Sequence, residues 1–199
     1  MTSDATVARA EFRVFGQEII DGVRSRMWNC RSVLGQSRRM PAETYILSRL
    51  TNDANVKVRA GLLDIKVKRG ETADGYEIFE PRGKFTFPVG TQDLAAIALQ
   101  LRVTLPLDGE TCTFEAFLEM VRQHPDLVAV TVEKMRYGFT IDGVICEYAQ
   151  VYFNGAMVES ACVESDRHDA MREVIAGLGL ADRPNVNYLK AAKHVVGLD

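Results

Sequence analysis

Residues 128–164 read VAVTVEKMRYGFTIDGVICEYAQVYFNGAMVESACVE, a stretch in which apolar and polar residues largely alternate. The alternation is interrupted at Asp142-Gly143 and again at Asn154-Gly155. Both dipeptides are typical of two-residue hairpin loops, because both turn positions need a positive φ. We therefore predict three consecutive antiparallel strands, at roughly 129–141, 144–153 and 156–164.

The two loops also set the register of these strands. A loop at Asp142-Gly143 places Ile141 opposite Val144, and counting back from that pair places Lys134 opposite Val151. The second loop, counted in the same way, places Glu147 opposite Cys162. Directly opposed residues share one side of a sheet, so one face is predicted to be apolar and the other polar. The polar face carries Lys134, Arg136, Glu147, Ser160 and Glu164.

An earlier hairpin repeats this pattern. With Ala60-Gly61 as its loop, Lys57 lies opposite Asp64 and Arg59 lies opposite Leu62. Three predicted strands each present two basic residues separated by one apolar residue, and the first predicted strand presents an acid and a base in the same way. These triplets are Lys57-Val58-Arg59, Lys66-Val67-Lys68, Lys134-Met135-Arg136 and Glu11-Phe12-Arg13.

The rest of the chain supplies further strands and several helices. Strands are predicted at roughly 11–15 and 44–50, from about 76, and around Phe85 and Phe87. Apolar residues at helical spacing predict helices in roughly 19–27, 94–105, 114–121 and 170–178, and after Asn187. We treat residues 1–199 as one domain, with strands in roughly 8–88 and 128–164 and helices in roughly 92–123 and 165–197.

The polar sheet face has two interpretations. It can be the solvated face of an open sheet, on which Lys and Arg also discourage edge pairing. However, basic pairs recur at corresponding positions, whereas the carboxylates Glu11, Glu147 and Glu164 occur singly. If the helices cover the apolar face, the sheet can close with its charged face inside. The second interpretation is an α+β fold: a closed antiparallel β-barrel of about eight strands that forms a charged tunnel, with helices packed outside.

Composition limits the partners. The chain has 199 residues, with 24 Lys or Arg, 27 Asp or Glu and a formal net charge of −3. Proteins that bind nucleic acid or anionic membranes by bulk attraction are usually basic, so nucleic acid is disfavoured and a membrane partner is not expected. The sequence leaves the oligomeric state open, a homo-oligomer included.

The cysteines and the N-terminus indicate the compartment. The cysteines form no CxxC pair or zinc-finger spacing, and they are Cys30, Cys112, Cys146 and Cys162. The first residues, MTSDATVARAEFRVFG, contain no apolar stretch of signal-peptide length. We therefore expect reduced thiols and a cytoplasmic setting.

A second basic region lies outside the triplets. Trp28 is surrounded in sequence by arginines that could bind RNA or a protein partner through phosphate contacts and stacking. A solvated helix and loop is the favoured alternative, since the whole chain is acidic. The arginines are Arg24, Arg26, Arg31, Arg38 and Arg39.

Taken in order, these segments resemble the CYTH superfamily, the triphosphate tunnel metalloenzymes, which includes class IV adenylate cyclases, thiamine triphosphatases and inorganic triphosphatases. The resemblance extends from Glu11 to about Asp166 and rests on Glu11–Arg13, Tyr45–Ser48, Val56–Arg59, Leu63–Lys66, Glu133–Tyr137, Glu147 and Cys162–Glu164. It implies a tunnel in which basic side chains clamp a triphosphate or nucleotide and glutamates hold Mg²⁺ or Mn²⁺. The implied anion-binding residues are Arg13, Lys57, Arg59, Lys66, Lys68, Lys134 and Arg136, and the implied metal-binding and catalytic residues are Glu11, Glu147 and Glu164.

The acidic motifs depart from the family pattern. The family opens with ExExK, whereas here Arg13 replaces the second acid and Phe15 replaces the lysine. A later ExE motif reads Cys162-Val163-Glu164 and lacks its first acid. Two functions therefore stay open: a metal-dependent triphosphate phosphohydrolase, and a catalytically inactive module that binds a nucleotide or another polyanion.

Both functions share one electrostatic requirement. Like charges about 4 Å apart repel by roughly 4 kcal/mol per pair at an effective dielectric near 20. A cluster of basic groups in one enclosure therefore needs counter-ions. We predict that the tunnel holds phosphate or an equivalent anion, or ordered carboxylate bridges.

Overall fold

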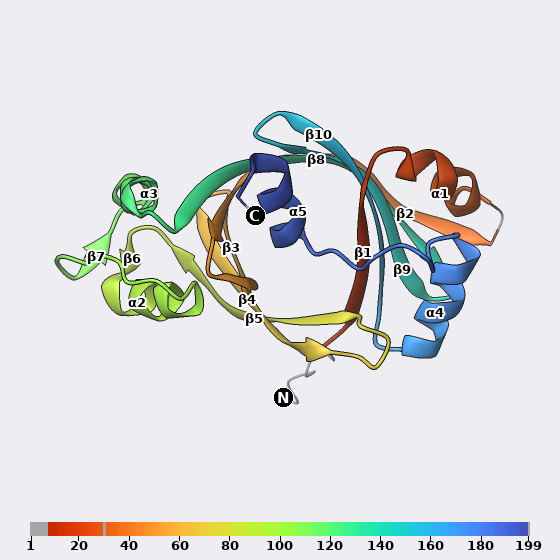
Figure 1. Ribbon diagram of the computed structural model, residues 1–199, viewed down its shortest axis with the longest axis horizontal. Coiled ribbons are helices and arrows are strands. Elements are labelled where there is room, and N and C mark those ends of the chain that lie inside the picture. The colour runs from red at the N-terminus through yellow and green to blue at the C-terminus, as the bar shows by residue number, and fades with distance from the viewer. Residues whose placement is uncertain (1–7, 30, 199) are drawn as a thin grey trace.

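The computed structural model describes residues 8–29 and 31–198 and contains a closed eight-stranded barrel (Figure 1). The order around the barrel is β1-β10-β9-β8-β2-β3-β4-β5, and all neighbouring strands are antiparallel. The strands are β1 (Ala10–Gly16), β2 (Ser32–Ser48), β3 (Thr51–Arg59), β4 (Leu62–Glu71), β5 (Glu77–Thr86), β8 (Leu127–Ile141), β9 (Val144–Phe153) and β10 (Ala156–Ser165).

Five helices and a small ladder complete the described structure. The ladder pairs β6 (Val89–Gly90) with β7 (Thr111–Cys112). The helices are α1 (Ile19–Met27), α2 (Thr91–Gln100), α3 (Phe114–Gln123), α4 (His168–Gly177) and α5 (Tyr188–Val196). Within the described residues, none of these helices has the length and apolar character that crossing a membrane requires.

The hairpin register is the one that the turn dipeptides predict. Asp142 and Asn154 both have a φ of 49°, in the left-handed region that such loops need. Gly138 lies opposite Glu147, and Glu147 lies opposite Cys162. In the earlier hairpin Lys57 lies opposite Asp64, also as predicted. The alternation of polar and apolar residues therefore separates the two faces of the barrel wall.

Four helices cover the apolar outer face of the barrel. On one side α1 and α4 pack on β1, β9 and β10, where Val23 and Met171 join a buried cluster with Phe12 and Cys146. On another side α2 and α3 cover β3 and β4, where Leu94 and Phe117 are buried in a second cluster. These two clusters account for the apolar strand face, and they confirm the prediction of helices packed outside for α1 to α4.

Helix α5 has a different position, because it lies within the ring (Figure 1). Its residues Leu189 and Ala192 are buried against Val151 and Phe153, which lie on the same face of β9 as Glu147. The face predicted to be polar is therefore apolar at one end of the barrel, and the apolar side of α5 is buried there. The sequence analysis predicted a helix after Asn187, which is confirmed, but it placed all helices outside the barrel, which is wrong for α5.

The chain reaches this position through the wall beside β1. Strand β1 pairs with β5 only at Ala10 and Glu11. Beyond that point the segment before α5 lies along β1, where the Val186 amide donates to the Arg13 carbonyl at 2.7 Å and the Arg13 amide donates to Asn185 Oδ1 at 2.9 Å. The segment thus satisfies backbone groups of β1 that have no β5 partner.

Strand β2 is much longer than predicted. The sequence indicated a strand over about 44–50, but β2 begins at Ser32, and its first part pairs with β8 alone. Strand β3 joins β2 only from Thr44 onward. Because residues 33–39 are exposed on both faces, they lack the alternation that marks a half-buried strand. The interpretation of Arg38 and Arg39 as part of a solvated loop is therefore wrong.

Candidate anion-binding tunnel

Basic side chains from three strands converge inside the barrel. Arg13 and Lys134 are the deepest, with side chains only 7% and 8% exposed, whereas the Arg59 side chain is 38% exposed. The cations therefore extend from the buried interior toward solvent. We call them the interior basic cluster, and its members are Arg13 on β1, Lys57 and Arg59 on β3, and Lys134 and Arg136 on β8.

Two tyrosines form the floor beneath the deepest cations. The Arg13 guanidinium carbon lies 4.6 Å from the centre of the Tyr188 ring, and Lys134 Nζ lies 4.5 Å from it. Lys134 Nζ also donates a hydrogen bond of 3.1 Å to the Tyr45 hydroxyl. Burial raises the pKa of Tyr45 and of Tyr188 to about 12, so both phenols are neutral at pH 7. Helix α5 thus supplies an aromatic surface that holds two cations by cation–π contact.

Glu43 is the centre of one ion-pair network. Its Oε2 accepts a hydrogen bond of 2.8 Å from Lys134, and its Oε1 lies 3.4 Å from Lys57 Nζ and 3.3 Å from Arg59 Nη1. Burial alone would raise the pKa of the Glu43 carboxyl, but the three cations outweigh burial and hold it below its ordinary value. One carboxylate on β2 therefore holds cations from β3 and β8.

Glu147 is the centre of a second network. Arg136 donates to its Oε2 through two nitrogens, and Arg13 Nη1 donates to its Oε1 at 3.2 Å. Arg13 also donates to Glu11 through Nε at 2.8 Å. Burial would raise the pKa of Glu11, but Arg13 outweighs this effect and lowers it. Arg13 therefore lies between two of the three glutamates that the resemblance assigned to metal.

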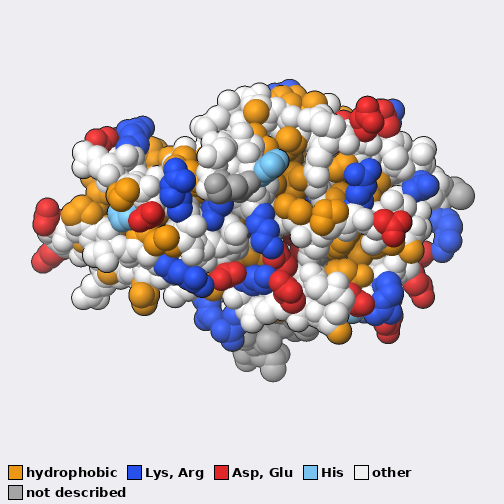
Figure 2. Space-filling view, in the orientation of Figure 1, with side chains coloured by type: hydrophobic (Ala, Val, Ile, Leu, Met, Phe, Trp, Pro, Cys, Tyr) orange, Lys and Arg blue, Asp and Glu red, His pale blue; other side chains and the backbone are white. Residues whose placement is uncertain are grey.

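These two networks confirm the prediction of ordered carboxylate bridges. In Figure 2, Lys and Arg side chains are interspersed with Asp and Glu side chains across the face between α5 and β5. Every cation of the interior basic cluster has a carboxylate within ion-pair distance. The cluster is thus held in place by carboxylates whose oxygens occupy positions that phosphate oxygens could also take.

The remaining predicted cations, Lys66 and Lys68, lie on the same face of β4 as Asp64, which the ladder places opposite Lys57. Lys68 binds Glu71, and it also binds Glu77 at 3.0 Å, the carboxylate that Asn187 at the start of α5 also binds. Lys66 lines a cavity of about 110 Å³ together with Glu11, Glu164 and Tyr188. The predicted basic residues therefore share the inner face, as the interior cluster, Lys66 in the adjoining cavity, and Lys68 paired with Glu77 beside the start of α5.

The three glutamates that the resemblance assigned to metal do not form a cluster of free carboxylates. Glu11 and Glu164 are directly opposed on β1 and β10 and line the same cavity, where Glu164 lies 3.6 Å from Arg9. Both oxygens of Glu147 are bonded to arginines. Across residues 8–29 and 31–198, no three or more His, Cys, Asp or Glu side chains are grouped so that they could hold a metal ion. The arrangement fits an anion better than a divalent cation.

Two residues on the inner face were missed by the sequence analysis. Glu43 follows Pro41 in the part of β2 that shows no alternation, so neither its strand nor its face was predicted. Arg38 lies directly opposite Arg136, in the part of β2 that was interpreted as a loop. Both could have been found by extending the β8 register onto a partner strand, had the length of β2 been known.

Two orphan acceptors also belong to the inner face. Asp64 Oδ1 and Asn55 Oδ1 are buried without a hydrogen-bond partner. Asp64 lies opposite Lys57, and Asn55 lies opposite Lys66. A buried acceptor without a donor is costly, so both atoms are suited to a donor carried by a bound molecule or by water.

No family model and no curated protein matches the sequence, but solved structures do match the fold. A conserved hypothetical protein from Pyrococcus furiosus superposes with a TM-score of 0.52 at 17% identity, covering 92% of this chain and 98% of its own. A candidate adenylate cyclase from Bacillus halodurans superposes with a TM-score of 0.51 at 11% identity, covering 93% and 98%. Because both identities are this low, the likeness shows a shared fold alone.

Proposed function

We propose that this chain, which has a CYTH-like fold, binds triphosphate or another polyphosphate-containing anion in the charged half of its barrel. The observation that carries the proposal is the convergence of Arg13, Lys57, Arg59, Lys134 and Arg136 into one interior. The Bacillus halodurans structure with the same fold, a candidate adenylate cyclase, is consistent with a ligand that carries phosphates.

The chemistry of the cluster suits a chain of phosphates. Arginine presents paired N–H donors that match two phosphate oxygens, whereas lysine acts as a compact point charge. Phosphate oxygens would compete with the Glu43 and Glu147 carboxylates for the same donors. The aromatic floor keeps Arg13 and Lys134 oriented while that exchange of partners occurs.

Calorimetric titration with tripolyphosphate tests this proposal without any assumption about turnover. Arg59→Gln removes a cation that is partly exposed and therefore removable with little disturbance of the interior. We expect it to weaken binding roughly tenfold to a hundredfold, the equivalent of a lost charge-assisted contact of about 1.5–3 kcal/mol. Arg122→Gln on the exterior of α3 is the matched control and should leave binding unchanged. Equal binding by both variants would contradict the proposal.

Hydrolysis of the bound polyphosphate is the second candidate function. Glu11 and Glu164 favour it, because they oppose each other beside Lys66, and carboxylate oxygens are the ligands that Mg²⁺ and Mn²⁺ prefer. As placed, however, Glu11 and Glu147 are bonded to Arg13, so these residues do not fit a divalent metal unless Arg13 moves. We therefore propose anion binding as the main function and hydrolysis as the second candidate.

A phosphate-release assay separates the two functions. The substrates are tripolyphosphate, ATP and thiamine triphosphate, each with Mg²⁺ and with Mn²⁺. A hydrolase should release phosphate and lose this activity in Glu164→Gln while it still binds tripolyphosphate. Binding without any release would select the module that only binds polyanions.

A further inference from the structure

The first part of β2 is an open sheet edge. Residues 32–43 pair on one side with β8, and among the described residues no strand pairs with their other side. Residues 33–39 are all exposed. Up to Met40 such an edge presents N–H and C=O groups to which another extended chain can add, whereas Pro41 has no N–H.

Side chains along this edge change from apolar to basic. Val33 is 67% exposed and Leu34 is 43% exposed at its start, and the half-exposed Trp28 packs on Phe139, the cross-strand partner of Leu34. Arg38 and Arg39 follow, and as adjacent strand residues they point to opposite faces. A complementary chain would therefore need apolar residues at one end and two adjacent acids at the other.

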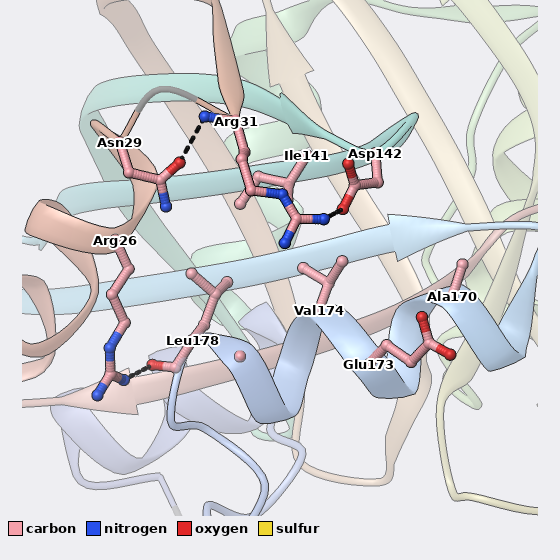
Figure 3. Close-up of a pocket in the computed structure, with 10 residues that line it drawn as sticks. Arg26, Asn29, Arg31, Ile141, Asp142, Ala170, Glu173, Val174 and Leu178 are labelled. Carbon is pink, nitrogen blue, oxygen red and sulfur yellow. Dashed lines mark hydrogen bonds and ion pairs between the residues drawn. The ribbon is translucent and has the colours of Figure 1, made fainter.

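The nearby arginines differ in how far they are already neutralised. A pocket of about 280 Å³ lies beside the start of β2, and in it Arg31 binds Asp142 at 2.7 Å. Figure 3 shows this pair and the hydrogen bond that Arg26 donates to the carbonyl of Leu178. Arg24 pairs with Asp21. For Arg38 and Arg39, by contrast, the described residues provide no carboxylate within ion-pair distance. The edge itself therefore carries the unneutralised charge.

This pattern distinguishes between partners. A second copy of the chain would bring no carboxylate to Arg38 and Arg39, because residues 32–40 contain no Asp or Glu, so paired edges would leave both arginines unneutralised. An acidic chain would instead pair its carboxylates with Arg38 and Arg39 as it adds backbone hydrogen bonds. We infer that the edge of β2 over residues 32–40 docks an extended acidic segment of a partner protein by strand addition.

Binding of a fluorescent peptide, followed by anisotropy, tests the inference. The probe is acetyl-Thr-Glu-Glu-Thr-Thr-Thr-Val-Val-Thr-amide, which can place two acids opposite the arginines and two valines opposite Val33 and Leu34 in an antiparallel pairing. Trp28, the sole tryptophan, gives a second signal because it packs on Phe139, the cross-strand partner of Leu34. We expect saturable binding by the full chain and a change in Trp28 fluorescence.

Two controls separate strand addition from simple charge attraction. The same peptide with alternate backbone nitrogens methylated keeps its charge but cannot complete the ladder, so it should bind at least about tenfold more weakly. Arg39→Glu lies on the outer face opposite Met135, away from the tunnel, and should lose the acidic peptide while gaining the corresponding Lys-Lys peptide. Arg122→Glu on α3 should behave as the wild type.

The inference is independent of the proposed function, since tripolyphosphate binding should be unchanged in Arg39→Glu. Equal binding of the methylated and unmethylated peptides would overturn it. So would dimerisation of the chain through this edge, or displacement of the peptide by an oligouridylate that binds more tightly.

Discussion

At the scale of single residues, Glu43 pairs with three cations of the interior basic cluster. It is 1% exposed and contacts Lys57, Arg59 and Lys134, which come from two different strands. A buried ion pair is weak support for stability as a whole, but the loss of one partner leaves the others uncompensated. Glu43 therefore acts as an internal counter-ion that keeps the basic cluster assembled.

Glu43→Gln should make the chain less stable but more responsive to its ligand. Removing this charge should lower the free energy of unfolding by roughly 3–5 kcal/mol, because three cations lose their shared carboxylate. Tripolyphosphate supplies replacement oxygens, so it should raise the thermal midpoint of the variant more than that of the wild type. Glu119→Gln on the exterior of α3 is the control. An unchanged midpoint in Glu43→Gln would contradict this role.

The same carboxylates set the acid limit of stability. Burial would raise the pKa of Glu43 and of Glu11, but neighbouring cations hold both below the ordinary value of 4.5. A carboxyl with a depressed folded-state pKa contributes stability that is complete above that ordinary value and is lost as the pH falls through the folded-state pKa.

Urea unfolding between about pH 6 and about pH 3 should therefore show a falling free energy of unfolding below the ordinary glutamate range. Glu43→Gln cannot titrate at this position and should lose less stability over the same interval. Parallel curves for the two proteins would mean that other carboxyls account for the acid dependence.

At the scale of elements, α5 joins the apolar and charged halves of the barrel. Asn187 begins it, accepting from the amides of Leu189 and Lys190 at 3.0 Å and donating to Glu77 at 2.8 Å. The next residue, Tyr188, lies against Arg13 and Lys134. The cap of this helix therefore controls the position of the aromatic floor.

Asn187→Ala and Thr113→Ala form a matched pair of helix-cap variants. Thr113→Ala removes only a cap and should cost about 1 kcal/mol of stability, whereas Asn187→Ala also removes a buried hydrogen bond to Glu77 and should cost about 1–3 kcal/mol more. Because Thr113 begins α3 on the outside, its variant should keep the affinity for tripolyphosphate. The α5 variant should bind several times more weakly, as measured by calorimetry. Equal affinities would show that α5 closes the barrel without positioning the cations.

The sequence predicted some elements well for a physical reason. Asp142-Gly143 and Asn154-Gly155 determine their loops locally, so the register of β8, β9 and β10 followed from short-range chemistry alone. The first part of β2 could not be predicted in this way, because exposure on both faces removes the alternation. Glu43 was missed together with that strand.

The position of α5 depends on contacts that no local pattern encodes. The apolar side of α5 resembles that of any surface helix. The inner face is charged elsewhere but apolar at positions such as Val151 and Phe153, and these positions are where α5 is buried. The same limit applied to the predicted site. Register placed Glu147 on the inner face, but it could not reveal that Arg13 and Arg136 bind both of its oxygens.

At the scale of the whole molecule, an acidic chain conceals a basic interior. The formal net charge is −3, yet five cations converge on the inner side of a closed wall, each paired with a carboxylate. Long-range attraction of an anion should therefore be weak, and binding should depend on contacts made within the barrel. Raising the salt concentration should lower the affinity for tripolyphosphate less than it would for exposed charges, because buried pairs are screened less.

The most direct test is a crystal structure of the chain determined with tripolyphosphate bound. We predict phosphate density inside the barrel, in contact with Arg59, Lys57, Lys134 and Arg136, with the Glu43 carboxylate displaced from at least one of its cations. Tripolyphosphate found only on the outer surface, with every interior ion pair intact at saturating ligand, would contradict the account.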